Sequence, residues 1–417
     1  MANIIFFTVP LFGHVNYGLK LAKNLIKRGH RCFYFSGRNY QYLVEQKGVC
    51  FLPYSDKIEK MFTDESSTYN SAAMSTGQEY HIDYLEEIWN LTVHLFTITE
   101  QIMRQDIDQI RDLKPDCIVY DNIAIWGRWA ADQLNIPCFS SGTPYCYTEK
   151  MIQTYPTELM ELFYKDTDYA SQSIIPFLRM YTRRIHRMFP DLPLYPVTMN
   201  FSGSGDYNFI YTIPEFQLHP QLIDAERNCF AGILTDEDDT SPDVSQYIST
   251  DRKNVYIALG TIYNNHSLYR RCIRALKDLD VNVILSIGKS NTASDFGPVP
   301  GHWHVKNVFP QIALLKHIDV FISHGGANSL REACHFGVPM VILPQTGDHF
   351  LGAKDVLRAG TGYVLEGSAG ETEIREAVSS CLVNQEMKTR CDLLADKMRK
   401  AGGLDKVTEI IESYLSF

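Results

Sequence analysis

The sequence lacks the long apolar runs and the basic excess that would direct a protein to a membrane or to nucleic acid. No apolar run approaches the ~20 residues that a membrane-spanning helix needs. The net charge of −10 argues against a general nucleic-acid binder, because Lys and Arg supply most of that affinity by neutralising phosphates. The N-terminus also lacks the basic region of a signal peptide. We therefore expect a cytoplasmic protein without stable insertion into a membrane.

The ten cysteines lack the spacing of a zinc site or a disulfide framework. They are scattered from Cys32 to Cys391 with no CxxC pair, and several lie inside apolar segments. This pattern is typical of reduced, buried thiols in a cytosolic protein. The acidic run DEDDT at 236–240 lies in a stretch that resembles a linker, and we interpret it as a solvated loop rather than a metal site.

Strands alternate with helices in both halves of the chain. At 417 residues the chain is too long for one ordinary core, so two domains are expected. In the first half the predicted strands are NIIFFTVP, RCFYFS, VCFLPY, DCIVYD, IPCFSS and NFIYTIP. In the second half they are VYIALGT, VNVILSIG, DVFISHGG, VPMVILPQ and TGYVLE. Each half is thus predicted to be a doubly wound α/β domain with a parallel sheet.

We place the first domain at 1–215, a linker and domain edge at 216–250, and the second domain at 251–417. The linker is low in apolar residues and gathers Asp, Ser and Pro. The last helix is free to pack back on the first domain. Doubly wound folds bind ligands at the carboxyl ends of their strands, so a cleft between two such sheets is the expected site.

A histidine stands at the turn from the first predicted strand into the first helix. The apolar run reaches Val9 and the helical pattern begins at Val15, so Gly13 and His14 lie between them. An imidazole suits proton abstraction from an alcohol, because its pKa is near neutrality. Asp121 ends the strand DCIVYD and could orient such a histidine. The structural alternatives are a solvent-facing turn histidine and a helix-capping aspartate.

The segment SHGGANSLREACHFG runs from a strand into a helix through two glycines. Gly325 and Gly326 let a ligand approach the backbone closely, and the helix N-terminus favours an anion such as a diphosphate. Ser329 adds a hydroxyl, and Glu332 could reach an adjoining ribose. The alternative is a tight strand-to-helix turn with no ligand.

Polar residues also follow the next predicted strand, VPMVILPQ. Gln345 is succeeded by Asp348 and His349, and a carboxylate with an imidazole there suits the hydroxyls of a sugar. Asp348 also fits the N-cap of the following helix, a role compatible with sugar binding.

The stretch FPQIALLKHIDVFISHGGANSLREACHFGVPMVILPQTGDHFLGAKDVLRAGTG resembles the nucleotide-sugar signature of family 1 UDP-glycosyltransferases, which have the GT-B fold. Within that family the chain is most similar to bacterial macrolide and natural-product glycosyltransferases. GHVN, KPDCIVYD and VYIALGT extend the resemblance over nearly the whole chain. It implies two Rossmann-like domains facing across a cleft, with acceptor binding in the first and nucleotide-sugar binding in the second.

The resemblance implies roles for the residues that match the family's motifs. His14 matches the catalytic base, and Asp121 matches the carboxylate that supports it. Gln311 matches the residue whose backbone holds the base, and Glu332 the ribose ligand. The other matches are His324, Gly326, Asn328, Ser329 and the Gly260-Thr261 loop for the diphosphate, and Asp348 with His349 for the sugar hydroxyls. The family also implies inversion at the anomeric carbon, no metal and no cofactor, since the nucleotide sugar is a co-substrate.

Three positions depart from the family pattern. Val308 stands where relatives often carry a tryptophan that stacks on the base, which leaves UDP as first choice and TDP as second. His349 replaces the usual glutamine, and a histidine there accompanies galactose donors in plant members, so UDP-glucose and UDP-galactose both stay open. Tyr17 replaces the proline that usually follows GHVN.

The expected reaction moves a hexose to a hydroxyl of a small hydrophobic acceptor such as a macrolide, a phenol or another natural product. Stretches rich in Met and aromatics, including IDYLEEIWNLTVHLF and TPYCYTEKMIQTYPTELMELFY, suit an apolar acceptor pocket. Two other functions are kept: a nucleotide-sugar epimerase of the same architecture and a catalytically silent partner subunit.

One helical segment, LRMYTRRIHRMF, carries two stripes. Arg179, Arg183 and Arg187 form one, and an apolar stripe is formed by Leu178, Tyr181, Ile185 and Met188. The arginines suit an anionic membrane or an acidic acceptor, while a solvated helix face is the commoner interpretation.

Overall fold

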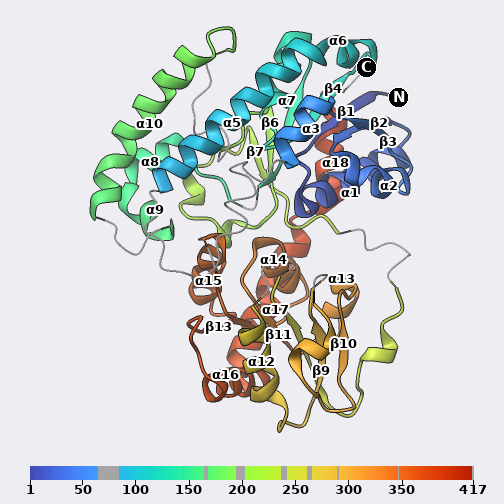
Figure 1. The fold of residues 1–417 in the computed structure, drawn as a ribbon, viewed down its shortest axis with the longest axis vertical. Helices are drawn as coiled ribbons and strands as arrows, with labels where there is room; N and C mark the ends of the chain where they lie inside the picture. Colours follow the sequence, from blue (N-terminus) through green and yellow to red (C-terminus); the bar gives the residue numbers. More distant parts are fainter. Residues whose placement is uncertain are drawn as a thin grey trace. The chain divides into compact units, whose positions relative to one another are not determined.

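The computed structural model describes residues 1–63, 84–143, 145–163, 168–193, 202–235, 242–260, 265–288, 291–345 and 347–415 (Figure 1). Within these ranges the side chains of residues 63, 84–88, 143, 160–163, 168–175, 177, 347 and 348 are not described. The described residues form two compact units. Unit 1 comprises those up to 235 and from 401 onward, and unit 2 comprises those from 242 to 400.

Unit 1 is built on a seven-stranded parallel sheet. Its strands are β1 (Asn3–Phe7), β2 (Arg31–Ser36), β3 (Cys50–Pro53), β4 (Cys117–Asp121), β5 (Cys138–Thr143), β6 (Tyr207–Ile210) and β7 (Asn228–Phe230). They lie in the order β3-β2-β1-β4-β5-β6-β7, and each neighbouring pair is parallel. The order reverses between β1 and β4, so the carboxyl ends of these two strands flank the crevice in which such sheets bind ligands.

The helices of unit 1 cover both faces of this sheet (Figure 1). They are α1 (Phe12–Lys27), α2 (Gln41–Glu45), α3 (Asp56–Thr63), α5 (Tyr84–Gln105), α6 (Ile107–Asp112), α7 (Trp126–Leu134), α8 (Glu149–Thr154), α9 (Pro156–Phe163), α10 (Asp168–Met188) and α18 (Gly403–Tyr414). Of these, α10 packs on α5 and α9 rather than on the sheet itself. After Asn3, strand β1 is entirely apolar, because alternate residues face opposite layers and both layers are covered. Ile5 and Phe7 pack in the core with α5 and α7, whereas Ile4 and Phe6 pack in the core with α1 and α18.

The last helix, α18, belongs to unit 1 although the chain has passed through unit 2 before it. Val407 and Ile411 are fully buried in the core beside α1. Polar contacts join the same two helices, since Asn24 Nδ2 donates to Thr408 Oγ1 over 3.0 Å and an Arg28 guanidinium nitrogen lies 2.9 Å from a Glu412 oxygen. Burial of its apolar face thus holds α18 on unit 1.

Unit 2 is built on a six-stranded parallel sheet in the order β10-β9-β8-β11-β12-β13. Its strands are β8 (Lys253–Ala258), β9 (Val281–Ser286), β10 (His304–Lys306), β11 (Val320–Ser323), β12 (Met340–Ile342) and β13 (Gly362–Val364). The helices are α12 (His266–Leu276), α13 (Gln311–Leu315), α14 (Ala327–His335), α15 (Gly347–Ala359), α16 (Glu371–Val383) and α17 (Gln385–Lys400). Here the strand order reverses between β8 and β11.

The core of unit 2 also has two layers. Val255 and Ile257 of β8 pack with α12 and α16, while Tyr256 faces the other layer and stacks on Phe321 with ring centroids 5.1 Å apart. The predicted fold class, two doubly wound parallel sheets, is confirmed.

Two details differ from the prediction. Helix α1 begins at Phe12 rather than near Val15, so His14 lies in its first turn and not in the loop before it. Strand β7 lies inside the stretch 216–250 that the sequence assigned to a linker, because three residues are too few to show an alternating pattern. The run DEDDT falls outside the described residues.

The cysteines are mostly buried, as the sequence predicted. Nine of the ten cysteines are buried and Cys50 is exposed, and all ten are free thiols. Burial raises the pKa of the Cys32 thiol to about 12, so this buried thiol stays protonated at neutral pH. Among the described residues, no helix combines the length and apolar character needed to cross a bilayer.

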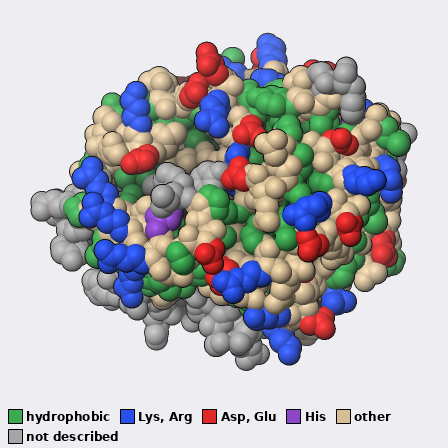
Figure 2. Space-filling model, turned by 90° about the horizontal axis from the view of Figure 1, so that it is seen from above, with side chains coloured by type: hydrophobic (Ala, Val, Ile, Leu, Met, Phe, Trp, Pro, Cys, Tyr) green, Lys and Arg blue, Asp and Glu red, His purple; other side chains and the backbone are tan. Residues whose placement is uncertain are grey.

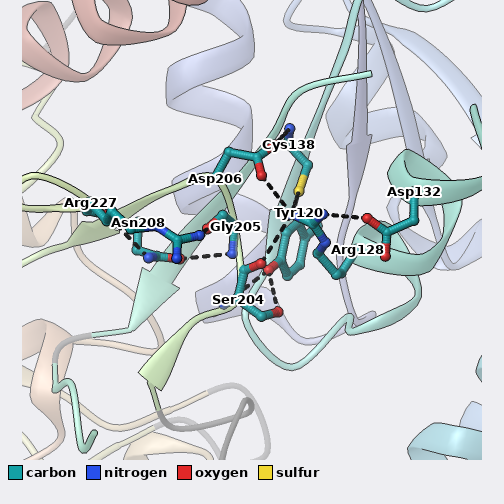
Figure 3. Close-up of polar contacts among 9 residues, drawn as sticks. All are labelled: Tyr120, Arg128, Asp132, Cys138, Ser204, Gly205, Asp206, Asn208 and Arg227. Carbon is teal, nitrogen blue, oxygen red and sulfur yellow. Dashed lines mark hydrogen bonds and ion pairs between the residues drawn. The ribbon is translucent and has the colours of Figure 1, made fainter. Parts of the chain in front are cut away.

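A polar network fastens the start of β5 and the residues before β6 to α7 (Figure 3). The Arg128 guanidinium binds Asp132 one turn along α7 and lies 2.8 Å from Asp206 Oδ1. Asp206 Oδ2 accepts a 2.9 Å hydrogen bond from the backbone N–H of Cys138. One arginine therefore ties two carboxylates and, through Asp206, a strand end.

The same network reaches two neighbouring strands. Tyr120 of β4 shares a 2.7 Å hydrogen bond with Ser204, and the backbone N–H of Gly205 donates to Asn208 Oδ1 over 2.9 Å. A side chain at Gly205 would meet the Ser140 backbone nitrogen at 2.5 Å, so this close approach needs glycine. The cluster holds the start of β5 and the residues before β6 in place. The carboxyl ends of these strands stay available for ligands.

Replacing Arg128 with methionine is expected to lower the free energy of unfolding by about 2 kcal/mol, because two carboxylates lose their cation. The side chains of Asp132 and Asp206 are 25% and 37% exposed, so solvent offsets part of the loss. Urea denaturation followed by circular dichroism measures the change.

The matched control is Arg111→Met, which breaks an exposed ion pair with Asp108 on one helix. It is expected to change stability by less than about 0.5 kcal/mol. Equal effects of the two substitutions would contradict a structural role for the network.

Candidate active site

Each unit places predicted site residues at the point where its strand order reverses. In unit 1, His14 lies in the first turn of α1 after β1, and Asp121 is the last residue of β4. In unit 2, Gly260 follows β8 and His324 follows β11. Residues far apart in the sequence thus meet because adjacent parallel strands end at one edge.

His14 and Asp121 are hydrogen-bonded through Nδ1 of the imidazole and Oδ2 of the carboxylate. The Asp121 side chain is 4% exposed, whereas that of His14 is 26% exposed. The other carboxylate oxygen accepts a 2.9 Å hydrogen bond from the backbone N–H of Ile123. The carboxylate therefore organises the turn after β4 and orients the imidazole, which leaves the Nε2 atom of His14 for a substrate.

The charge of Asp121 sets the protonation of His14. Burial lowers the pKa of His14, but the negative charge of Asp121 and the hydrogen bond to it outweigh burial, so the pKa is raised above 6.5. In its neutral form the ring keeps a proton on Nδ1 for Asp121 and offers a bare Nε2. That form can accept a proton from a substrate.

Three buried tyrosines surround this pair, and the sequence did not single them out. Tyr34 donates to the backbone oxygen of Val15 over 2.9 Å, and Tyr54 donates to that of Thr8 over 3.0 Å. Tyr211 shares a 2.5 Å hydrogen bond with Ser141.

These phenols remain neutral donors. Burial raises the pKa values of Tyr34, Tyr54 and Tyr211, and the charge of Asp121 raises each further. Two of them fix the backbone that connects β1 to α1, and hence the place of His14. Tyr34 lies in β2, and Tyr54 and Tyr211 directly follow β3 and β6, so sequence reasoning had no signal that separates them from ordinary core residues.

In unit 2 three glycines make room around the segment after β11. A Cβ atom at Gly326 would lie 2.6 Å from His324 Nε2, and one at Gly260 would lie 3.5 Å from the same ring. Gly325 has a φ of +95°, and a side chain there would meet the backbone oxygen of His349 at 2.9 Å. The imidazole of His324 is therefore packed between two backbone segments at the N-terminus of α14.

The side chain of Gln311 contacts two residues of α14 that the sequence predicted to bind the nucleotide sugar. The Nε2 atom of Gln311, the first residue of α13, lies 2.7 Å from Glu332 Oε2 and 3.1 Å from Ser329 Oγ. The sequence assigned Gln311 a backbone role. Its side chain also holds the carboxylate and the hydroxyl together on one face of α14, where a ribose and a phosphate could meet them.

His349 is buried and neutral. Its side chain lies edge-on to His324 with ring centroids 4.4 Å apart, and burial lowers the pKa of His349 to about 4. Its Nδ1 atom accepts from the backbone N–H of Gln345 over 3.3 Å, so the proton of the neutral ring resides on Nε2. His349 is thus a hydrogen-bond donor, as glutamine can be, rather than a cation.

The remaining residues predicted for the nucleotide-sugar site are either exposed or only partly described. Val308 is 53% exposed, and the neighbouring Phe309 is buried against Tyr247, so the ring of Phe309 does not stand in for the usual tryptophan. Asn328 is exposed on the first turn of α14. Asp348 lies in the first turn of α15, but its side chain is outside the described part, and Thr261 lies outside the described residues.

Most of the described aromatic and Met content predicted for an acceptor pocket lies in the core. Tyr147, Met151 and Leu159 are buried together, and Phe96 packs on Trp129 with ring centroids 5.3 Å apart. The beginning of the first stretch and the end of the second fall outside the described residues. These residues build the layer of helices around unit 1.

Comparisons with known proteins agree with this architecture. The family model for the erythromycin biosynthesis protein CIII-like C-terminal domain matches residues 270–413. The UDP-glucosyltransferase YojK and the NDP-glycosyltransferase YjiC of Bacillus subtilis are each 26% identical to the chain, covering 99% of it and 97% of each relative. The calicheamicin glycosyltransferase CalG4 superimposes with a TM-score of 0.75 at 22% identity, over 100% of this chain and 98% of that one.

The chain is a glycosyltransferase, and its residues 270–413 match the erythromycin CIII-like C-terminal domain. It has the GT-B fold and is related to the bacterial macrolide and natural-product glycosyltransferases, as the sequence motifs predicted. The similarity to YojK and YjiC covers both units of this glycosyltransferase and not the C-terminal signature alone.

Replacing Gly326 with alanine is expected to weaken binding of a nucleoside diphosphate to this glycosyltransferase by at least about tenfold, since a Cβ must displace His324 or the first turn of α14. Isothermal titration calorimetry with UDP measures the affinity. Gly301→Ala is the control, because nothing lies within 4 Å of its added Cβ. Unchanged affinity in the Gly326 variant would show that this turn does not contact the diphosphate.

Proposed function

We propose that the protein is an inverting glycosyltransferase that moves a hexose from UDP-glucose or UDP-galactose to a hydroxyl of a small hydrophobic acceptor. His14 is the general base, and Asp121 orients it. The observation that carries this proposal is the hydrogen bond between the two side chains at the reversal point of the unit 1 sheet.

The acceptor oxygen attacks the anomeric carbon on the face opposite the diphosphate, and the bond from that carbon to the diphosphate oxygen breaks. The acceptor proton passes to Nε2 of His14, and the nucleoside diphosphate leaves with the bonding electrons. Asp121 stabilises the imidazolium that forms, as in other His–Asp pairs. An α-linked donor then gives a β-glycoside.

Unit 2 supplies the donor side of the proposal. The N-terminus of α14 carries unpaired backbone N–H groups and the positive end of the helix dipole, which favour the charge that develops on the diphosphate. His324 adds a donor beside it, and Glu332, already held by Gln311, suits the ribose hydroxyls. Asp348 and the Nε2–H of His349 are assigned to the sugar hydroxyls.

The base of the donor nucleotide is a separate part of the proposal. One relative is named a UDP-glucosyltransferase and another an NDP-glycosyltransferase. The similarity to these relatives therefore supports a nucleotide-sugar donor but does not distinguish between UDP and TDP. The lack of an aromatic platform at Val308 removes a stacking contact worth about 1–3 kcal/mol. UDP is proposed first and TDP second.

The test incubates the protein with UDP-glucose, UDP-galactose and TDP-glucose against flavonoids, macrolides and simple phenols, with products read by mass spectrometry. We expect a mass gain of one hexose with a UDP-sugar, and a rate about 10²–10⁴-fold lower in His14→Ala. The exposed residue His317 supplies the control His317→Ala, expected to be unaffected.

Three results would contradict parts of this account. A His14→Ala variant as active as the parent would show that His14 is not the general base. Interconversion of UDP-glucose and UDP-galactose without an acceptor would favour an epimerase. UDP binding without transfer to any acceptor would favour a silent partner subunit.

The pH dependence of kcat/KM is expected to show an acidic limb above pH 6.5. His14 accepts a proton only when neutral, and its pKa is raised, so activity is lost as the pH falls through that raised value. In Asp121→Asn the attraction to the carboxylate is gone while burial still lowers the pKa. The limb is then expected at lower pH, with a lower maximal rate, and a limb that does not move would contradict the assignment.

A further inference from the structure

The outer face of α10 carries arginines that have no partner in the part of the chain that the structure describes. Arg179, Arg183 and Arg187 are exposed and make no ion pair, hydrogen bond or ring contact with a described residue. Every other arginine makes at least one such contact. Among the described arginines, only those on this face of α10 therefore lack a partner.

The spacing gathers these side chains on one half of the helix. At about 100° per residue, Arg179, Arg183 and Arg187 follow one another along a stripe with Met180 beside it. Met188 lies at the C-terminal end of the helix, on the side toward Tyr181. Both methionines are exposed, Met180 by 53% and Met188 by 46%. The sequence grouped Met188 with the apolar stripe, and the structure shows that its side chain is exposed.

The inner half of α10 is already packed. Tyr181 lies against Trp89 of α5 with ring centroids 4.5 Å apart, and Phe189, just beyond the helix, lies 5.7 Å from Phe96. Ile185 is buried, with 1% of its surface exposed. The apolar burial that holds α10 in place thus does not need the outer face, which we call the arginine face (Arg179, Met180, Arg183, Arg187 and Met188).

Charge on this face is uncompensated locally. No Asp or Glu occurs between Asp168 and Asp191, in a chain of net charge −10. Asp191 itself lies 3.7 Å from Arg104. Figure 2 shows Lys and Arg side chains gathered at the left, the side on which α10 lies in Figure 1, with hydrophobic side chains among them. Like charges spaced four residues apart destabilise a helix slightly, so this arrangement costs stability.

We propose that the arginine face docks unit 1 on an anionic membrane surface. Each arginine that reaches the headgroup layer gains electrostatic attraction, and the two methionines can enter the acyl boundary between them. A nucleic acid or an acidic protein would match the charge but not the exposed methionines. The docking is peripheral, and it brings the glycosyltransferase to the phase in which hydrophobic acceptors dissolve.

The test measures sedimentation of the full chain with vesicles of phosphatidylcholine alone and of phosphatidylcholine with phosphatidylserine in equal amounts. We expect binding to the anionic vesicles only. The triple variant R179Q/R183Q/R187Q is expected to bind roughly 100-fold more weakly. Raising the salt from about 0.1 M to about 1 M, which shortens the screening length from about 10 Å to about 3 Å, should release the parent protein.

The control variant is K47Q/K277Q/K316Q, which removes the same charge from exposed lysines elsewhere and is expected to bind like the parent. Circular dichroism melting checks that both variants fold. Equal binding of the arginine variant and the parent, or binding to neutral vesicles as strong as to anionic ones, would overturn the proposal. So would tight binding of the parent to single-stranded DNA without vesicle binding. His14→Ala should bind vesicles normally, so this proposal can fail or hold independently of the proposed activity.

Discussion

The contact between His14 Nδ1 and Asp121 is the interaction on which the proposed chemistry of unit 1 depends. Asp121 is almost fully buried at the end of β4, and a buried carboxylate must be satisfied by donors. One oxygen takes the backbone N–H of Ile123 and the other takes the imidazole, which fixes both the turn after β4 and the tautomer of His14. The same contact raises the pKa of His14 against the effect of burial. Orientation and basicity of the ring thus have one physical source.

The doubly wound topology explains why such a contact forms between residues so distant in sequence. Strands β1 and β4 are neighbours although two strands and several helices separate them along the chain, and the strand order reverses between them. In unit 2 the strand order likewise reverses between β8 and β11. There the strands are followed by glycines rather than by a residue suited to act as a base. The reversal point of unit 1 therefore holds the proposed proton acceptor, and that of unit 2 holds the turn and the packed imidazole proposed for the diphosphate.

The sequence allowed the strands, the two sheets and the ends of the key strands to be predicted, because buried parallel strands are continuous apolar runs followed by polar residues. The pairing of His14 with Asp121 followed from the family motifs and from the shared sheet edge, but contact itself depends on side-chain packing. Tyr34 and Tyr54, which fix the β1–α1 connection, look like any core tyrosine in a one-dimensional pattern. Strand β7 was not predicted because three residues are too few to show an alternating pattern. The exposure of Met188 did not follow from its place in the apolar stripe, because the neighbouring Phe189 packs inward.

The most direct test of the central claim observes His14 itself. Nitrogen NMR of protein labelled with ¹⁵N-histidine, assigned by loss of one signal pair in His14→Gln, reports the tautomer and the pKa of the ring. The account predicts a neutral form protonated on Nδ1 and bare on Nε2, with a pKa above 6.5 that falls in Asp121→Asn. A neutral ring protonated on Nε2, or a pKa at or below 6.5 that is indifferent to Asp121, would contradict it.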